Sequence, residues 1–303
     1  MKTYLALSTN PYFNLAWEEY IFKHIEFDED IFLIWQNETS LTLGRNQNIY
    51  EEINLYHTYN FMIPVVRRSS GGGTVFHDLG NINYSLITKK TNLRSNYEVA
   101  TKGLVECLHS LGIPAYFSPK TDIKVEGFKV SGNAQAIFKD RLLHHGTLLF
   151  NADINLLQKA LKPKDESIQS KGIKSNRTQV INLSQYTNLT LDAFKNYLMT
   201  YFNLEVHTLT SQDLMHIDEL MHDKYIKDHW NYGESPESTI KKVRGDYEVE
   251  LHIFEGVIQS CKIIYKKDEL TSLSSSLLTM SFVPDVLLPV LVEHPLLFQM
   301  LFD

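Results

Sequence analysis

The sequence predicts an α/β (α+β) fold with a mixed, largely antiparallel sheet flanked by helices, and a small accessory α/β domain at the C-terminus. Three observations predict this class. Helical periods occur between short apolar runs, the runs come mostly in pairs joined by turn residues, and turn formers gather at residues 232–238. Strands joined by tight turns are antiparallel, so a doubly wound parallel sheet fits the pattern less well.

The first expected element is a helix. Residues 14–25 repeat apolar side chains at helical spacing, and Glu18 and Glu19 fall on the opposite face. The segment therefore predicts an amphipathic helix with both glutamates on its polar face.

Short apolar runs predict the strands that follow. The runs 31–35 and 40–44 are separated by turn residues and predict a hairpin or paired strands. The runs 62–66 and 74–77 flank a loop rich in arginine and glycine. Residues 81–86 alternate polar and apolar side chains, as a strand with one face on the core does, so the polar face is expected to point elsewhere.

The middle of the chain continues the mixed pattern. Residues 97–111 have a helical period, residues 124–130 predict a tight hairpin, and residues 144–150 predict a strand. Helical patterns return over residues 156–161 and 191–202.

The turn formers at residues 232–238 mark the expected domain boundary. We expect a large domain over residues 1–235 and a small domain over residues 240–303. The small domain begins with the alternating residues 247–253 and ends with a helix-like segment at residues 283–294.

Composition and charge exclude several classes of protein. The 303 residues are 43% hydrophobic, 12% aromatic and 21% charged, which is typical of a packed globular chain and excludes collagen-like or wholly disordered chains. The net charge of −7 and the pI near 5.9 argue against a nucleic-acid binder, because such domains are usually basic.

Neither a membrane anchor nor a disulfide framework is expected. The longest apolar stretch, residues 286–292, contains Pro289 and is far shorter than the roughly 20 residues of a spanning helix. The N-terminal apolar run is too short for a secretory segment. Cys107 and Cys261 are too few for a disulfide framework and are expected to be packing thiols. We therefore expect a cytoplasmic protein without a membrane partner.

The loop at residues 67–73, which reads RRSSGGG, is the first candidate functional segment. Consecutive glycines let the backbone approach a ligand closely, and arginines can neutralise a phosphate or a carboxylate. The loop matches neither the P-loop nor the Rossmann motif. We expect a nucleotide site of another fold, with a flexible turn as the alternative.

A second candidate segment surrounds Lys129, which lies between Gly127 and Gly132 on the predicted hairpin. The lysine could be fixed in place there, and a hydrated surface lysine is the alternative. His144 and His145 are adjacent on a predicted strand and point to opposite faces, which disfavours a shared metal ion. These segments contain no cysteine, which argues against a covalent cysteine enzyme.

The segment at residues 67–81 strongly resembles the signature of the lipoate-protein ligase A family. The likeness covers about residues 1–235, and the C-terminal segment resembles the family's accessory domain but is somewhat short. The implied fold is that of biotin and lipoate ligases, related to class II aminoacyl-tRNA synthetases. Further segments resemble the family's motifs in the same order, namely Thr121-Asp122, Lys129-Val130-Ser131-Gly132, His144-His145-Gly146-Thr147-Leu148-Leu149, Lys171-Gly172-Ile173-Lys174-Ser175 and Trp230-Asn231-Tyr232-Gly233.

The resemblance implies a two-step ligase. Lipoate and ATP would give lipoyl-AMP and pyrophosphate, with Mg²⁺ as a cofactor, and the lipoyl group would then pass to a lysine of a lipoyl-domain protein. Attack of a carboxylate on a phosphate brings two anions together. Fixed positive charge from Arg68 and Lys129 would offset their repulsion.

The resemblance also implies the acceptors. They would be acyltransferase subunits of 2-oxoacid dehydrogenases and a glycine-cleavage H-like protein. Lipoyl domains are typically acidic around the target lysine in this family's biology, and this chain is itself acidic. A local basic face at Lys171, Lys174 and Arg177 would reconcile the two.

Individual site residues are carried over by the same resemblance. Lys129 is the implied catalytic residue and would polarise the acyl carbonyl. The implied ATP site consists of Arg68, Gly73, Thr74, Val75, Phe76 and Lys129. The implied lipoate contacts are Lys129, Arg68, Ser70, Gly73, His77, Asn83 and His145.

Three further residues are weaker candidates. Trp35 and Trp17 could line an apolar slot for the lipoyl tail, with ordinary core packing as the alternative. Asp122 could assist Mg²⁺ or adenine, although its neighbour Thr121 stands where the family more often has asparagine.

Three other functions are the alternatives, and the sequence disfavours the last two. A lipoyltransferase that takes preformed lipoyl-AMP would keep most of the same residues. An ATP-independent octanoyl transferase would need a cysteine nucleophile, which the site segments lack. The intact Arg68 and Lys129 argue against a non-catalytic lipoate-binding module.

Overall fold

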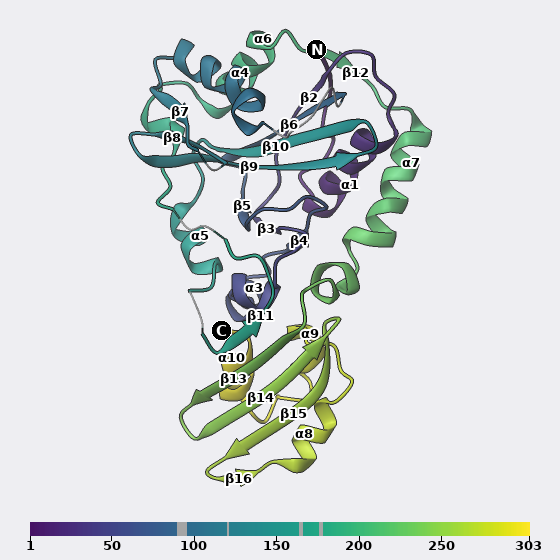
Figure 1. The fold of residues 1–303 in the computed structure, drawn as a ribbon, viewed down its shortest axis with the longest axis vertical. Coiled ribbons are helices and arrows are strands. Elements are labelled where there is room, and N and C mark those ends of the chain that lie inside the picture. Colours follow the sequence, from purple (N-terminus) through teal and green to yellow (C-terminus); the bar gives the residue numbers. More distant parts are fainter. Residues whose placement is uncertain (90–95, 120, 164–165, 176–177) are drawn as a thin grey trace.

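The computed structural model describes residues 1–89, 96–119, 121–163, 166–175 and 178–303. Its described strands form three sheets, which are mostly antiparallel and flanked by helices (Figure 1). This confirms the mixed α/β class expected from the sequence. The eight-stranded sheet lies at one end of the molecule, the five-stranded sheet lies at the other, and the three-stranded sheet lies between them (Figure 1).

The eight-stranded sheet is the main scaffold. Its strands are β1 (Lys2–Tyr4), β2 (Ile31–Trp35), β6 (Asn81–Lys89), β7 (Ala115–Phe117), β8 (Asp122–Val125), β9 (Phe128–Phe138), β10 (Arg141–Leu149) and β12 (Glu205–His207). They lie in the order β12-β1-β2-β6-β10-β9-β8-β7, and β1 is parallel to both of its neighbours. The register of β6 and β10 aligns Asn83 with Thr147 and Ser85 with His145. The predicted hairpin at residues 124–130 is confirmed as the turn between β8 and β9.

The three-stranded sheet carries the glycine-rich loop. Its strands are β3 (Ser40–Leu43), β4 (Val65–Arg67) and β5 (Val75–His77), with β3 in the centre. The predicted pairing of the runs 31–35 and 40–44 is wrong, because β2 joins the large sheet and β3 joins the small one. In the connection between them, the Gln36 carbonyl and the Asn37 side chain accept hydrogen bonds from the buried Asn14 side chain.

Helices cover both faces of the large sheet (Figure 1). The helices are α1 (Pro11–His24), α2 (Ile49–Glu52), α3 (Leu55–Asn60), α4 (Tyr97–Ser110), α5 (Ile154–Ala160), α6 (Leu191–Tyr201), α7 (Ser211–Leu220), α8 (Thr271–Leu277), α9 (Pro284–Leu287) and α10 (Pro295–Phe302). A 3-10 turn spans Leu183–Gln185, and π-helical turns span Met221–Tyr225 and His229–Gly233. One hydrophobic core joins α4 and α6 to the sheet, and a second joins α1 and α7 to it. Cys107 is buried in the first core, as expected, and burial raises the pKa of its thiol to about 12.

Helix α1 is not the amphipathic helix that the sequence predicts. The side chain of Asn10 caps its first turn, but Glu18 and Glu19 are 3% and 4% exposed. Both carboxylates are buried because α1 lies between the large sheet and α7 with the π-helical turn after it. Glu19 forms ion pairs with Lys23 and Lys224, while Glu18 points toward the sheet, where it meets β10.

The five-stranded sheet forms the C-terminal part. Its strands are β11 (Ile168–Ser170), β13 (Ser238–Arg244), β14 (Tyr247–Phe254), β15 (Val257–Tyr265) and β16 (Asp268–Glu269). The β14–β15 hairpin confirms the predicted strand, turn and returning strand. The predicted helix at residues 283–294 is wrong, because α9 ends at Leu287 before Pro289, which has no backbone N–H, and α10 begins at Pro295.

The two predicted domains share structure across the predicted boundary. Strand β11 precedes the boundary in the sequence but pairs with β13, and one hydrophobic cluster contains Leu41 and Leu43 of β3 together with Leu251 of β14. The division at residues 235–240 stays a prediction. Among the described residues, no helix is long and apolar enough to span a membrane.

Candidate functional site

Arg68 holds the glycine-rich loop between β4 and β5 in shape. Its Nε donates to Ser70 Oγ at 3.0 Å, and its Nη1 donates to the Thr42 carbonyl at 3.1 Å. Its Nη2 donates to the carbonyls of Gly71 and Gly73 at 2.6 and 2.8 Å. Among the described residues, these contacts use four of the five N–H groups of the guanidinium, so one N–H on Nη1 is left for a ligand. Burial lowers the pKa of Arg68 to about 10, so the side chain is cationic near neutral pH.

Arg67 does not face the loop. The expectation that both arginines neutralise an anion is wrong for Arg67, whose side chain is fully buried. Its guanidinium donates to the carbonyls of Gln47 and Asn231 at 2.7 and 2.9 Å, and to Ser235 Oγ at 2.8 Å. Arg67 therefore ties the three-stranded sheet to the segment before β13.

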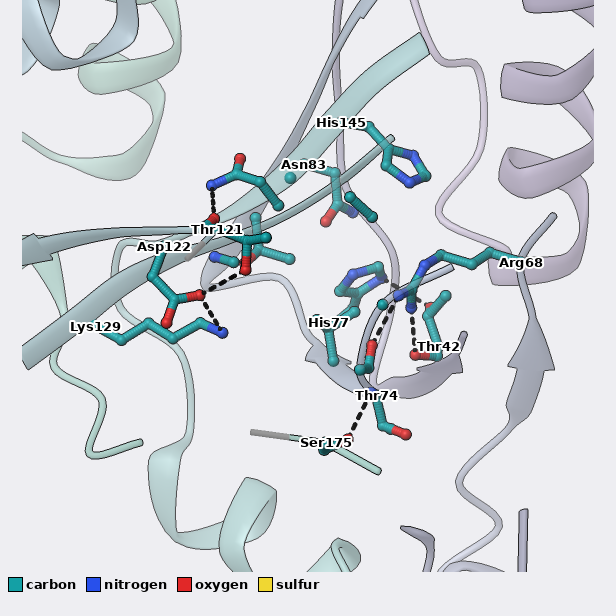
Figure 2. A pocket seen from close by; sticks show the side chains of 18 of the residues that line it. Thr42, Arg68, Thr74, His77, Asn83, Thr121, Asp122, Lys129, His145 and Ser175 are labelled. Atoms are coloured by element: carbon teal, nitrogen blue, oxygen red, sulfur yellow. Dashed lines mark hydrogen bonds and ion pairs between the residues drawn. The ribbon is translucent and has the colours of Figure 1, made fainter. Parts of the chain in front are cut away.

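Lys129 is held in place near the start of β9. Its backbone N–H donates to the Gln179 carbonyl at 2.9 Å, and its carbonyl accepts from Ile181 N at 3.0 Å. Its ammonium lies 3.0 Å from Asp122 Oδ1, and the side chain is 21% exposed (Figure 2). The side chain lies across Gly132, where a Cβ atom would be 2.7 Å from Nζ. The lysine is thus held by its neighbours rather than free in solvent.

The loop and Lys129 line the same cavity, which holds about 890 Å³ of space and opens to solvent. Figure 2 shows Lys129 and Asp122 on one side and Arg68 and His77 on the other. The lining residues are Leu15, Trp35, Thr42, Arg68, Gly72, Gly73, Thr74, Val75, His77, Asn83, Tyr97, Thr121, Asp122, Lys129, Gly132, Asn133, Ala134, His145, Gly146, Thr147 and Ser175.

The wall of this first cavity near α1 and β6 is apolar with a few polar groups. Leu15 and Trp35 supply apolar surface, and the Trp35 ring lies edge-on to His77 with ring centres 6.0 Å apart. Asn83 is buried, and its Nδ2 has no partner among the described residues. An extended apolar chain could lie along this wall and meet a buried amide donor.

A second cavity of about 860 Å³ adjoins the first. Its walls are largely apolar, and its lining residues include Leu149, Leu157, Leu161 and Val180. The residues shared by the two cavities are Thr74, Val75, Lys129, Thr147 and Ser175. A ligand with two chemically different ends could therefore occupy both cavities and present its middle to Lys129.

The histidines near the site are not arranged as metal ligands. Burial lowers the pKa of His77 to about 3, with Arg68 and His145 adding to the effect, and burial lowers the pKa of His144 likewise. His144 contacts Gln135 while His145 faces the loop, as expected for adjacent strand residues. In the described part of the chain, no three His, Cys, Asp or Glu side chains cluster in a way that could hold a metal ion.

Most of the predicted site residues meet at the first cavity. They are Trp35, Arg68, Gly73, Thr74, Val75, His77, Asn83, Asp122, Lys129 and His145. Ser70 lies behind the wall and contacts Arg68 and His145, and Phe76 lines the second cavity. Trp17 is 1% exposed and packs in the hydrophobic core between α1 and the large sheet, so the structure does not place it at the acyl slot.

Sequence reasoning missed the residues that hold the loop from outside. Ser175 Oγ accepts from the backbone N–H of Thr74 at 3.0 Å and from Gln47 Nε2 at 2.9 Å, and it donates to Glu52. Ser175 ends one of the segments that resemble the family's motifs, so the sequence did indicate a role for it in the site. The sequence around Gln47 and Glu52 gives no such indication. Glu18 was also missed, because its pattern assigned it to a polar face.

The predicted basic face is partly described. Lys171 is exposed, and Lys174 is exposed but forms an ion pair with Glu51 at 3.2 Å. Arg177 lies outside the described residues.

Residues 10–203 match the family model of the lipoyl protein ligase A/B catalytic domain. The chain is 38% identical to the lipoate-protein ligase LplJ of Bacillus subtilis, over 84% of this chain and 81% of that protein. It is 39% identical to lipoate-protein ligase 1 of Staphylococcus aureus over the same shares of the two chains.

Solved structures show the same fold. The LipL1 protein of P. falciparum in complex with lipoate superposes with a TM-score of 0.65 at 25% identity, covering 96% of this chain and 94% of that one. A bipartite lipoate protein ligase of Thermoplasma acidophilum, described with its E2 lipoyl domain, gives a TM-score of 0.67 at 25% identity, covering 77% and 96%. A lipoate-protein ligase A bound with ATP gives 0.67 at 24% identity, covering 77% and 98%.

Proposed function

The chain belongs to the lipoate-protein ligase family, and from this premise we propose that it activates lipoate with ATP and transfers the lipoyl group to a lysine of a lipoyl-domain protein. One observation supports this most strongly. A lysine held by its neighbours and a loop shaped by a buried arginine face each other across one cavity with an apolar wall.

In the first step, a carboxylate oxygen of lipoate attacks the α-phosphorus of ATP, and pyrophosphate leaves. Both reactants are anions, so their approach needs fixed positive charge. Lys129 supplies an ammonium group, and Arg68 supplies its cationic side chain with one N–H still available. The arrangement is preformed, so little reorganisation is needed when the two anions meet.

In the second step, the acceptor lysine's neutral ε-amine attacks the acyl carbon of lipoyl-AMP. The bond to the phosphate oxygen breaks, AMP leaves, and the new amide nitrogen loses a proton. Lys129 donates a hydrogen bond to the acyl oxygen, which makes the carbon more electrophilic. Asp122 holds the Lys129 ammonium group in the cavity, because Asp122 Oδ1 lies 3.0 Å from Lys129 Nζ.

The two cavities suit the two ends of the acyl adenylate. The apolar wall with Trp35 fits the lipoyl chain, and the apolar second cavity beside Val75 fits the adenine. Solved structures with the same fold are described in complex with lipoate and bound with ATP, which supports these two molecules as the substrates.

Mg²⁺ fits the site as a further participant. Asp122 is the one carboxylate among the described residues that line the first cavity, and Mg²⁺ is usually held by one or two carboxylates together with substrate phosphates and water. Bound there, the ion would supply further positive charge to the phosphates.

The acceptors complete the proposal. We propose the acyltransferase subunits of 2-oxoacid dehydrogenases and a glycine-cleavage H-like protein as acceptors. We also propose that the protein is cytoplasmic. The Thermoplasma acidophilum ligase described with its E2 lipoyl domain supports the general acceptor class.

Replacing Lys129 tests the proposal. With lipoate, ATP, Mg²⁺ and an apo lipoyl domain, the wild-type chain should add one lipoyl group to the domain, as measured by mass spectrometry. Lys129→Ala should leave the domain unmodified and the thermal unfolding curve nearly unchanged, because the side chain tip lies in a cavity. Full modification by the variant would show that this lysine is dispensable.

Exchange of labelled pyrophosphate into ATP separates the main alternative. A ligase catalyses this exchange when lipoate is present. A transferase that accepts preformed lipoyl-AMP modifies the acceptor from lipoyl-AMP but gives no lipoate-dependent exchange.

A further inference from the structure

The polar groups behind the cavity form a continuous hydrogen-bonded chain with Glu18 at its centre. Glu18 accepts from Ser85 Oγ and lies 2.8 Å from His145 Nδ1. On one side, Ser85 Oγ accepts from Trp35 Nε1 at 3.0 Å. On the other side, His145 Nε2 lies 2.6 Å from Ser70 Oγ.

This hydrogen-bonded chain ends at Arg68, whose Nε donates to Ser70 Oγ at 3.0 Å. Trp35, Arg68 and His145 line the first cavity, but Glu18 lines neither cavity. We propose that Glu18 is a positioning residue that holds the acyl wall and the glycine-rich loop together through this chain. The inference rests on the proposed function, because it assigns the two ends of the chain to lipoate and to ATP.

The directions of these hydrogen bonds follow from the groups that can only donate or only accept. The Trp35 indole and the Arg68 guanidinium can only donate, so the hydroxyl oxygens of Ser85 and Ser70 accept from them. Each hydroxyl then has one hydrogen to donate. Ser85 donates its hydrogen to Glu18, and Ser70 donates its hydrogen to Nε2 of His145 when the imidazole is neutral. The Glu18 carboxylate can only accept, so Nδ1 of His145 donates to it.

Glu18 receives donors from both directions, so its position requires a group that only accepts. A carboxylate meets this requirement, whereas a glutamine places an NH₂ donor against Ser85 or His145. Oε1 of Glu18 faces both donors, and Oε2 also lies 3.0 Å from His145 Nδ1. Depending on the orientation of the amide, the glutamine NH₂ group therefore either meets the Nδ1–H of His145 or leaves the Ser85 hydroxyl without an acceptor, and both outcomes are costly for buried groups.

The charge of Glu18 also matches the site. Glu18 contacts Ser85 and His145, and its carboxylate opposes the lowering of the Arg68 pKa that burial causes. Its neighbour Glu19 is equally buried but forms ion pairs with Lys23 and Lys224, away from the cavity. Glu19 thus offers a matched control for the loss of a buried carboxylate from α1.

The test compares Glu18→Gln with Glu19→Gln in lipoate-dependent exchange of pyrophosphate into ATP, with rates normalised to folded enzyme. Glu18→Gln should raise the KM for lipoate and the KM for ATP about tenfold each, although the residue touches neither substrate. Glu19→Gln should keep both KM values within about twofold of wild type. A merely structural role would lower the amount of folded enzyme and leave both KM values unchanged, and that result would overturn the proposal.

Ser85→Ala keeps the proposal testable if Glu18→Gln does not fold. This change breaks the link to Trp35 and leaves the link to Arg68 intact, so the KM for lipoate should rise about threefold or more while the KM for ATP stays near wild type. An unchanged KM for lipoate would refute the proposal. If the wild-type enzyme shows no exchange at all, the proposed function itself fails instead.

Discussion

Gly132→Ala should displace Lys129 without removing it. A Cβ atom at position 132 would lie 2.7 Å from Nζ and 2.8 Å from Cε of Lys129, where an ordinary contact begins at 3.4 Å. The ammonium must therefore move by about 0.7 Å. Because the obstructing atoms are the tip of a flexible side chain, the fold should accept the alanine, with a change in unfolding free energy under about 1 kcal/mol. The group that moves is the proposed catalytic cation, so catalysis should suffer instead.

The expected loss is about 10- to 100-fold in lipoate-dependent pyrophosphate exchange, since a misplacement near 1 Å can lower a rate by about two orders of magnitude. Urea unfolding measures the stability, and the exchange assay measures the rate. The double variant with Lys129→Ala provides the control. In that background Gly132→Ala should have almost no further effect, because the cation it displaces is already gone. The reasoning is refuted if the single variant keeps the wild-type rate, or if Gly132→Ala lowers the residual rate equally in both backgrounds.

Two further predictions concern stability. Trp17→Ala should lower the free energy of unfolding by about 3–5 kcal/mol because it opens a cavity in a packed core, while the KM for lipoate of the folded fraction stays near wild type, and urea unfolding with exchange kinetics checks both. His77 and His144 have pKa values of about 3 in the folded protein, below the ordinary 6.5, so the unfolded chain binds protons that the folded chain does not. Their contribution to the free energy of unfolding is fully present above pH 6.5. It is lost as the pH falls below 6.5, by up to about 1.4 kcal/mol per pH unit for each histidine. Urea unfolding at pH 5.0, 5.5, 6.0 and 7.0 should show this slope, and His77→Gln should reduce it; an unchanged slope would contradict the assignment.

Local chemistry made much of the site predictable from the sequence. The run of glycines predicted a loop, and Gly72 does adopt a φ of 87°, which residues other than glycine rarely adopt. The turn residues Glu126 and Gly127 marked the hairpin that carries Lys129. These features depend on a few consecutive residues, so their pattern is visible in the chain itself.

Contacts between distant segments decided the rest. Arg67 and Arg68 are adjacent and chemically alike, yet one is buried against the segment before β13 and the other shapes the loop. Glu18 has the pattern of a solvent-facing residue but lies buried against β10, 127 residues away in the sequence. Contacts between distant segments also decided the pairing of strand β2, which pairs with β6 and not with the expected partner β3.

The sequence by itself thus determined the type of most elements, the glycine-rich loop, the lysine on its hairpin and the family. Only the tertiary structure decided which charged side chains reach the cavity and which hold its walls from behind. The physical reason is that periodicity and turn chemistry act over a few residues. Burial of a charged group, by contrast, depends on which distant segments supply its hydrogen-bond partners.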